Sequence, residues 1–188
     1  MPRRYVALVP DEYYHVYNRG CNCQAIFCDA ENYLFFLRRL RKYLLPSLDV
    51  IAYCLMPTHY HLLVHVHSAD TSQALQRFSI SYTKAFNRQN GRVGALFQGA
   101  FKAKWVTKNA YLIHLSRYIH MNPVTAGLVT KPEDWVFSSF REYAGLRRGT
   151  MPRPAVVLSQ FPSIAAYVDF VAEYREDDVD VILELTLD

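Results

Sequence analysis

The chain has 188 residues, of which 51% are hydrophobic and 20% are charged. That length supports one domain with its own core, and this composition excludes an intrinsically disordered chain. No apolar run approaches twenty residues and the chain does not start with a signal-peptide pattern. We therefore expect a cytosolic protein rather than a membrane or secreted one.

The net charge of +4 conceals an uneven distribution along the chain. Residues 169–188 contain eight acidic side chains and one basic side chain, a net charge of −7, which leaves +11 on residues 1–168. A basic body attracts polyanions, because each Lys or Arg that pairs with a phosphate releases counterions. The distribution favours a nucleic-acid partner, and an acidic tail that either docks on the body or only solubilises it.

Hydrophobic periodicity predicts seven elements before residue 123. In chain order these are strand 12–18, helix 29–45, strands 49–56 and 60–68, helix 71–91, strand 96–106 and helix 109–122. Local signals set their boundaries: Asp29 and Thr71 are the expected helix N-caps, Pro57-Thr58 favours a tight turn, and Gly91 and Pro123 are expected to end their helices.

This order predicts an α+β fold with a ferredoxin-like β-α-β-β-α-β core, an antiparallel sheet and one open face for substrate, followed by an added helix. Beyond it, residues 131–145 are expected to form a short capping segment. Residues 149–163, which contain three prolines, are expected to form a linker, and the acidic end is expected to be helical. We divide the chain into a functional domain, residues 1–148, and a linker with an acidic tail, residues 149–188.

His59-Tyr60-His61 lies within the apolar, β-prone stretch "AYCLMPTHYHLLVHV". Residues i and i+2 of a strand point to the same face, so the two imidazoles stand roughly 6–7 Å apart along the strand. They are a candidate pair of ligands for one divalent metal. Two polar side chains on an exposed face are the alternative.

A second segment, "YLIHLSRYIHMNPVTAGLV", offers Tyr118 and Asn122 at i and i+4, on one face of a helix. With His59 and His61 they supply a metal platform, a third ligand and a phenol nucleophile, which are the parts needed to cut and rejoin DNA. The cysteines of "CNCQAIFC" lack the paired spacing of a zinc site, so we expect free thiols.

These residues resemble the HUH single-tyrosine transposases, and most closely the REP-associated tyrosine transposases. The resemblance rests on "YHVYNRG", "AYCLMPTHYHLLV", "LFQGAFKAKWV", "YLIHLSRYIHMNPVTAGLV" and "PEDWVFSSFREYAG", which cover roughly residues 13–145 in family order. It implies a metal site formed by His59, His61 and Asn122, with magnesium or manganese as the metal. Tyr118 would be the nucleophile, and Tyr60 stands where the family usually has an apolar residue.

The resemblance also implies the reaction and the partner. Residues 1–148 would be the catalytic domain of an enzyme that cuts and rejoins single-stranded or hairpin DNA, such as repetitive palindromic elements, through a covalent 5′-phosphotyrosine. We expect phosphate contacts from a basic set near the nucleophile and the N-terminus: Arg3, Arg4, Lys102, Lys104, Lys108 and Arg117. The sequence leaves the oligomeric state open between monomer and homodimer.

Several alternatives remain open from sequence. Tyr111 is the second candidate nucleophile, and His114 is a candidate to orient the Tyr118 phenol. His65 and His67 lie further along the strand than an ion at His59 reaches, and we expect them to be surface residues at its end. At the level of function, the alternatives are a domesticated DNA-binding protein that retains the fold and a relaxase-like nuclease.

Overall fold

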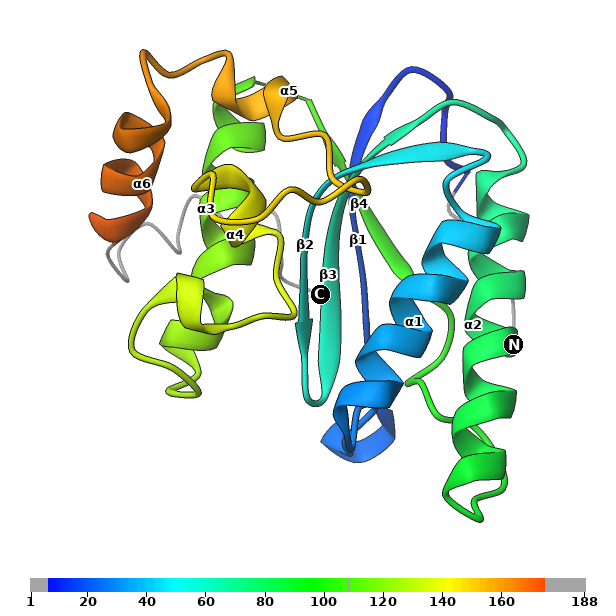
Figure 1. Cartoon of the computed structure of the whole chain (residues 1–188). Helices are drawn as coiled ribbons and strands as arrows, with labels where there is room; N and C mark the ends of the chain where they lie inside the picture. Colours follow the sequence, from blue (N-terminus) through cyan, green and yellow to red (C-terminus); the bar gives the residue numbers. More distant parts are fainter. Residues whose placement is uncertain (1–6, 108, 175–188) are drawn as a thin grey trace.

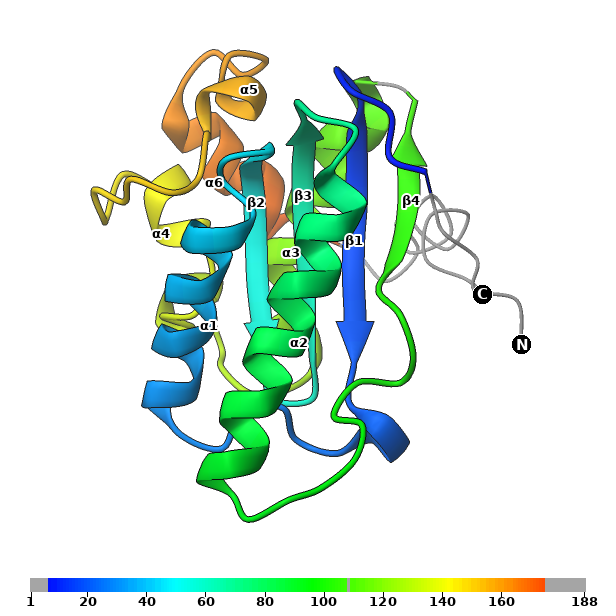
Figure 2. The ribbon, with the colours of Figure 1, turned by 90° about the vertical axis from the view of Figure 1, so that its right-hand side faces the viewer.

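The computed structural model describes residues 7–174 with the exception of residue 108. It contains a four-stranded sheet in the order β2-β3-β1-β4, in which every neighbouring pair is antiparallel. The strands are β1 (Tyr13–Arg19), β2 (Leu48–Met56), β3 (His59–Val66) and β4 (Lys102–Val106). This arrangement confirms the α+β, ferredoxin-like prediction (Figures 1 and 2).

Two helices, α1 (Ala30–Tyr43) and α2 (Thr71–Gln89), cover one face of the sheet (Figure 2). The α1 helix begins where predicted, because the Asp29 carboxylate accepts a hydrogen bond from the Asn32 N–H at 2.8 Å. Phe36 and Phe78 are fully buried between these helices and the sheet. Thr71 is the first helical residue rather than the N-cap, and its hydroxyl donates to the Ser68 carbonyl at 2.6 Å.

The opposite face is covered by α3 (Asn109–Thr125), with α4 (Phe140–Tyr143) and α6 (Ile164–Ala172) nearby (Figure 1). The prediction that Pro123 ends α3 was wrong, since the helix includes it. Pro123 lies in the last turn, where its missing N–H removes a single hydrogen bond and its ring has little helix left to disturb. Tyr118 and Asn122 still share one face.

The outer edge of β2 is closed by later parts of the chain. The Leu55 N–H donates to the Phe137 carbonyl at 3.0 Å, and the Ser139 N–H donates to the Tyr53 carbonyl at 2.9 Å. Further on, the Arg153 N–H donates to the Val50 carbonyl at 2.8 Å. These bonds satisfy backbone groups that an exposed edge strand leaves open.

The stretch 149–163 therefore packs on the domain instead of forming an extended linker. Val157 of α5 (Ala155–Leu158) and Tyr167 of α6 are fully buried against α3, and their burial explains why a proline-rich sequence holds a fixed path here. The functional boundary at residue 148 stays a prediction. The acidic residues after 174 lie outside the described residues.

Two smaller features complete the described fold. The predicted strand 96–106 is shorter than expected: only Lys102–Val106 forms β4, and Gly99 has a positive φ of 83° that interrupts the extended backbone before it. One-turn 3-10 helices lie at Cys21–Cys23 and Pro132–Asp134. None of the helices in the described residues combines the length and apolarity that crossing a bilayer requires.

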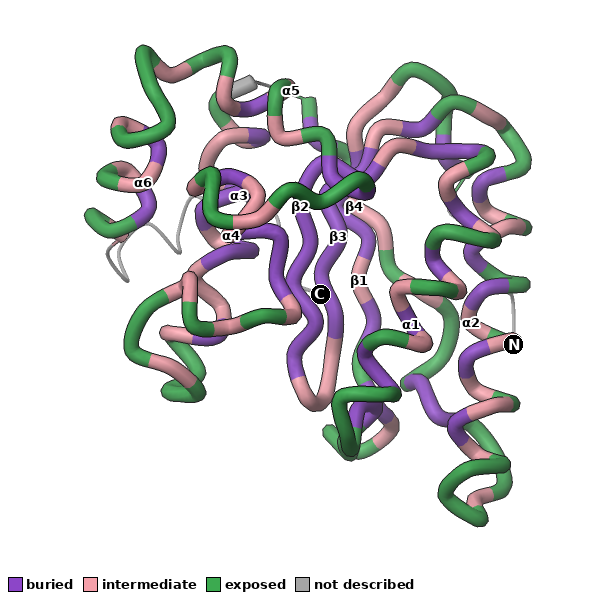
Figure 3. The backbone as a smooth tube through the Cα atoms, in the orientation of Figure 1, coloured by how far each residue is buried: buried purple, intermediate pink, exposed green. Residues whose placement is uncertain are grey.

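Side-chain alternation assigns the residues of β1 and β3 to the two faces. Val16, Leu62 and Val64 point towards α1 and α2 in one core cluster, while Leu63 belongs to the cluster under α3. The central strands are almost continuously buried (Figure 3). His59 and His61 share the register of Leu63, so they lie on the face that α3 covers.

Candidate functional site

The two histidines begin β3, directly after the predicted turn at Pro57-Thr58. Their ring centroids are 5.0 Å apart and the ring planes are 84° to each other. His61 is 7% exposed and His59 is half-buried. Burial lowers the pKa of His59, and burial together with the neighbouring imidazoles lowers the pKa of His61 well below its ordinary value. Both rings are therefore neutral at neutral pH, the form that binds metals.

In each imidazole the Nδ1 atom already has a hydrogen-bond partner. The Thr58 hydroxyl oxygen lies 3.0 Å from Nδ1 of His59, and Nε2 of His15 lies 2.9 Å from Nδ1 of His61. A neutral imidazole that donates through Nδ1 keeps its lone pair on Nε2. In the tautomer whose Nδ1 atoms donate to these partners, both Nε2 atoms can serve as metal ligands.

His15 is a residue that sequence reasoning missed. It is fully buried, and its ring stacks on Tyr17 at 4.7 Å and on His61 at 5.1 Å. In the β1–β3 register His15 is opposite Leu63 and diagonal to His61, close enough for an imidazole to reach. Alternation within "YYHVYNRG" placed His15 on one face of β1, but only the strand register brings it to His61.

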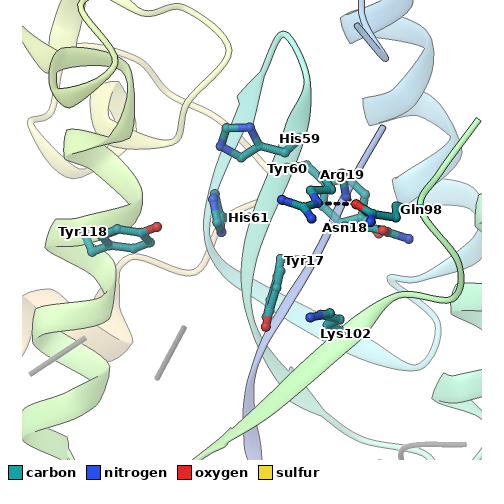
Figure 4. Close-up of a pocket in the computed structure, with 9 residues that line it drawn as sticks. All are labelled: Tyr17, Asn18, Arg19, His59, Tyr60, His61, Gln98, Lys102 and Tyr118. Atoms are coloured by element: carbon teal, nitrogen blue, oxygen red, sulfur yellow. Dashed lines mark hydrogen bonds between the residues drawn. The ribbon is translucent and has the colours of Figure 1, made fainter. Parts of the chain in front are cut away.

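Tyr118 approaches the histidines from α3. Its ring centroid is 5.5 Å from that of His61, at 78°, and its hydroxyl points towards the histidine pair (Figure 4). Burial raises the pKa of Tyr118, and a hydrogen bond with the Asn122 side chain partly opposes that shift. The phenol is therefore protonated at neutral pH and must lose its proton to act as a nucleophile.

Asn122 lies one turn beyond Tyr118 on α3, and its side chain interacts with both Tyr118 and His59. Its Nδ2 donates to the Tyr118 carbonyl at 2.8 Å, which fixes the side-chain amide. A hydrogen bond between the His59 imidazole and the Asn122 side chain also raises the pKa of His59 against the larger lowering by burial. The structure thus brings together His59, His61, Tyr118 and Asn122, the four residues that the sequence singled out.

A cavity of about 370 Å³ opens beside these residues (Figure 4). Its lining mixes polar and apolar surface and carries two cationic side chains; it consists of Tyr17, Asn18, Arg19, His59, Tyr60, His61, Gln98, Lys102 and Tyr118. The Arg19 guanidinium donates to the Gln98 side-chain carbonyl, which orients it at the rim. Arg19 was not predicted as a site residue, although it pairs directly with His59 across β1 and β3.

The predicted phosphate contacts have different outcomes. Lys102 lines the cavity, and Lys104 is half-buried on the same strand opposite His15. Arg117 is only 4% exposed: its guanidinium donates to the Phe170 carbonyl at 3.3 Å and stacks on that ring at 4.2 Å. The prediction for Arg117 was wrong, since this cation holds α6 against α3. Arg3, Arg4 and Lys108 lie outside the described residues.

The other candidates on α3 are not among the residues that line the cavity. Nδ1 of His114 lies 3.1 Å from the Arg117 guanidinium, and its ring centroid is 5.5 Å from that of Phe170 on α6. His120 is fully buried, with Nδ1 2.7 Å from the Tyr167 hydroxyl and Nε2 2.8 Å from that of Ser139. Tyr111 packs against the core cluster under α3.

The donor set fits a divalent metal. Two neutral imidazoles with Nε2 as the remaining nitrogen, and an amide held beside them, form a compact set of nitrogen and oxygen ligands next to a phenol. Imidazole alone suits zinc, nickel or copper, while an amide oxygen with water and phosphate oxygens suits magnesium or manganese. Manganese accepts both kinds of donor.

Comparison with known proteins shows what the central part of the chain is similar to. The model of the family described as "Transposase IS200 like" matches residues 30–122, a range that contains His59, His61, Tyr118 and Asn122. This segment, just under half of the chain, is similar to the IS200-like transposases. Among curated proteins it is similar to a REP-associated tyrosine transposase of Haemophilus influenzae, with 29% identity over 106 residues that cover 49% of this chain. The match spans 58% of the length of that relative.

Among solved structures, the fold is similar to that of a REP-associated tyrosine transposase bound to a REP hairpin. The TM-score is 0.59 with 18% sequence identity, and the alignment covers 81% of this chain and 96% of that one. At this level of identity the likeness establishes the fold.

Proposed function

We propose that the protein is a metal-dependent DNA nickase and strand transferase that forms a covalent 5′-phosphotyrosine at Tyr118. His59, His61 and Asn122 would hold the divalent ion, with magnesium or manganese as the metal. One observation carries the proposal: the Tyr118 ring lies 5.5 Å from the ring of His61, an imidazole whose Nδ1 is already engaged. A nucleophile and a metal ligand thus line the same cavity.

When bound, the ion would polarise the phosphoryl oxygen of the scissile group. The Tyr118 oxygen would attack phosphorus, forming a new P–O bond and breaking the bond to the 3′ oxygen, which takes up a proton and leaves as a free 3′-OH. The phosphotyrosine keeps the energy of the original bond. A different 3′-OH can therefore reverse the step and join new ends without ATP.

The cationic lining supports DNA as the partner. Arg19 and Lys102 line the cavity and would contact phosphates near the scissile group, and such contacts position DNA without reading its sequence. We propose single-stranded or hairpin DNA as the substrate, since the solved relative is bound to a REP hairpin. The four cysteines are free thiols, as expected, which fits the cytosolic location we propose.

The test is the covalent adduct. Wild-type protein mixed with a labelled DNA hairpin that has a single-stranded 5′ extension should form a protein–DNA adduct that survives denaturing electrophoresis. Tyr118→Phe removes one hydroxyl, retains the ring packing and should abolish the adduct while hairpin affinity stays close to wild type.

Tyr111→Phe is the matched control, since it removes a phenol hydroxyl from the same helix. It should leave the adduct intact. An adduct that persists in Tyr118→Phe and disappears in Tyr111→Phe would show that the nucleophile is misassigned. Hairpin binding without an adduct in the wild type would favour a protein that uses this fold for recognition alone.

A further inference from the structure

A second cluster of ligand-type side chains lies at the other end of the sheet face that carries His59 and His61. His65 and His67 are at i and i+2 at the end of β3, and Asp49 of β2 is the direct register partner of His65. The nearest members of the two clusters, His61 and His65, are four residues apart, which corresponds to roughly 13 Å along an extended strand. The two clusters are therefore too far apart to share an ion.

The three side chains converge on one point. Nε2 of His67 lies 3.1 Å from Oδ2 of Asp49, and the rings of His65 and His67 have centroids 5.0 Å apart at 83°. One ligand atom from each residue lies within 4.8 Å of the other two. Ligand atoms bound to one zinc ion at about 2.0–2.2 Å are roughly 3.3 Å apart. Small side-chain rotations thus bring the set into coordination distance.

Two of the three residues are held in place, and the third is accessible. The Tyr13 ring packs on the His65 ring with centroids 4.6 Å apart and an angle of 33°, which restricts that imidazole. Asp49 and His65 are half-buried within paired strands, whereas His67 is exposed. A pre-positioned pair with an exposed third ligand lets an ion reach the site from solvent and bind His67 as well.

Arg153 is the competing partner for Asp49. Its Nε lies 3.4 Å from Oδ1, the carboxylate oxygen that His67 does not contact, and its side chain is 63% exposed. An exposed pair of this kind contributes little stability, so the guanidinium is easily displaced. Its backbone stays tied to Val50, and only the side chain has to move.

We propose that Asp49, His65 and His67 form a second metal site, which takes a divalent transition-metal ion of the zinc class. Two imidazole nitrogens and one carboxylate oxygen are typical zinc ligands, and imidazole disfavours calcium and magnesium. The site is open to solvent, so water completes the coordination. A bound ion links β2 to β3 and stabilises the folded chain by mass action, because the unfolded chain has no formed site.

The test is zinc titration by calorimetry on untagged full-length protein carrying His59→Gln and His61→Gln, which removes the imidazole pair of the other cluster. This parent should bind one zinc ion through the proposed site. Adding His67→Ala should weaken that event at least about tenfold, because it removes a ligand from the site. Comparison with the parent separates this site from the exposed thiols, which are the same in both proteins.

Arg153→Gln is the matched control, since it removes the competing cation and no ligand, and zinc affinity should stay the same or rise. In the unmodified chain, imidazole NMR signals of His65 and His67 should shift together on addition of zinc, which tests the site without substitutions at buried histidines. A parent that binds no zinc, equal affinity with and without His67, or imidazole signals that do not respond would each overturn the proposal. The test measures zinc binding and not DNA cleavage, so its result does not depend on the proposed strand-transfer activity.

Discussion

Because His15 contacts His61, we expect substitution of His15 to weaken metal binding strongly, although His15 is not itself a proposed metal ligand. In the proposed site His61 would bind the ion through Nε2, so its Nδ1, which lies 2.9 Å from Nε2 of His15, would carry the proton and donate to His15. His15→Leu retains a buried apolar volume and removes the acceptor. The Nδ1–H of His61 then loses this partner, and His61 is only 7% exposed, so little water can replace it.

The expected magnitude follows from the role of such partners. Outer-shell partners of metal-binding histidines are worth about 10–100-fold in metal affinity, which corresponds to about 1.4–2.7 kcal/mol. A buried donor without a partner costs about 1–3 kcal/mol of stability. Manganese affinity by calorimetry should therefore fall by at least tenfold in His15→Leu, with a measurable loss in thermal unfolding.

A matched variant separates hydrogen bonding from packing. His15→Gln supplies an amide oxygen that can accept from Nδ1–H, so it should recover most of the manganese affinity that His15→Leu loses. The reasoning is refuted if the Leu and Gln variants bind manganese equally well, or if His15→Leu binds it as tightly as the wild type.

Four further outcomes are expected. A chelator should stop adduct formation and added manganese should restore it; equal cleavage in chelator and in metal would exclude the metal role. Asn122→Ala should slow adduct formation by about tenfold or more through loss of the amide beside His59 and Tyr118, with hairpin affinity nearly unchanged in a gel-shift assay. Wild-type stability should decrease as pH falls from 6.5 towards 3, because burial holds the pKa of His120 at about 3 and only the unfolded chain takes up the proton. In denaturant titrations His120→Gln should lose less stability over this range, by up to about 1.4 kcal/mol per pH unit. Deleting residues 175–188 removes a net charge of −5 and should raise DNA affinity at low salt. Deleting residues 164–188 also removes the buried Tyr167 and Val171 and should lower the melting temperature. Equal melting temperatures for the two deletions would show that α6 contributes no stability.

Sequence patterns predicted the core of the fold because they record local and periodic requirements. The Asp29 cap, the Pro57-Thr58 turn and the positive φ of Gly91, 59°, each act within a few residues. Tyr118 and Asn122 were correctly placed on one face of a helix for the same reason, since helical spacing fixes the relation of i to i+4.

What the sequence could not provide depends on contacts between distant segments. His15 reaches His61 only through the strand register, and Arg117 becomes a structural cation only because α6 returns to α3. The stretch 149–163 has a linker-like composition, yet backbone bonds to β2 give it a fixed path. Local composition carries no signal for any of these three contacts.

The closure of the β2 edge also bears on how the chain folds. Tyr53 and Ser139 are 86 residues apart in sequence, and the contact between Leu55 and Trp135 spans 80. Bringing such distant segments together carries a high loop-closure entropy, so these contacts are expected to form late. During synthesis, β2 keeps an open edge until residues 137–153 have emerged, and an open edge is a template for pairing with another chain. A product that terminates before residue 137 is thus expected to self-associate rather than persist as an inactive monomer.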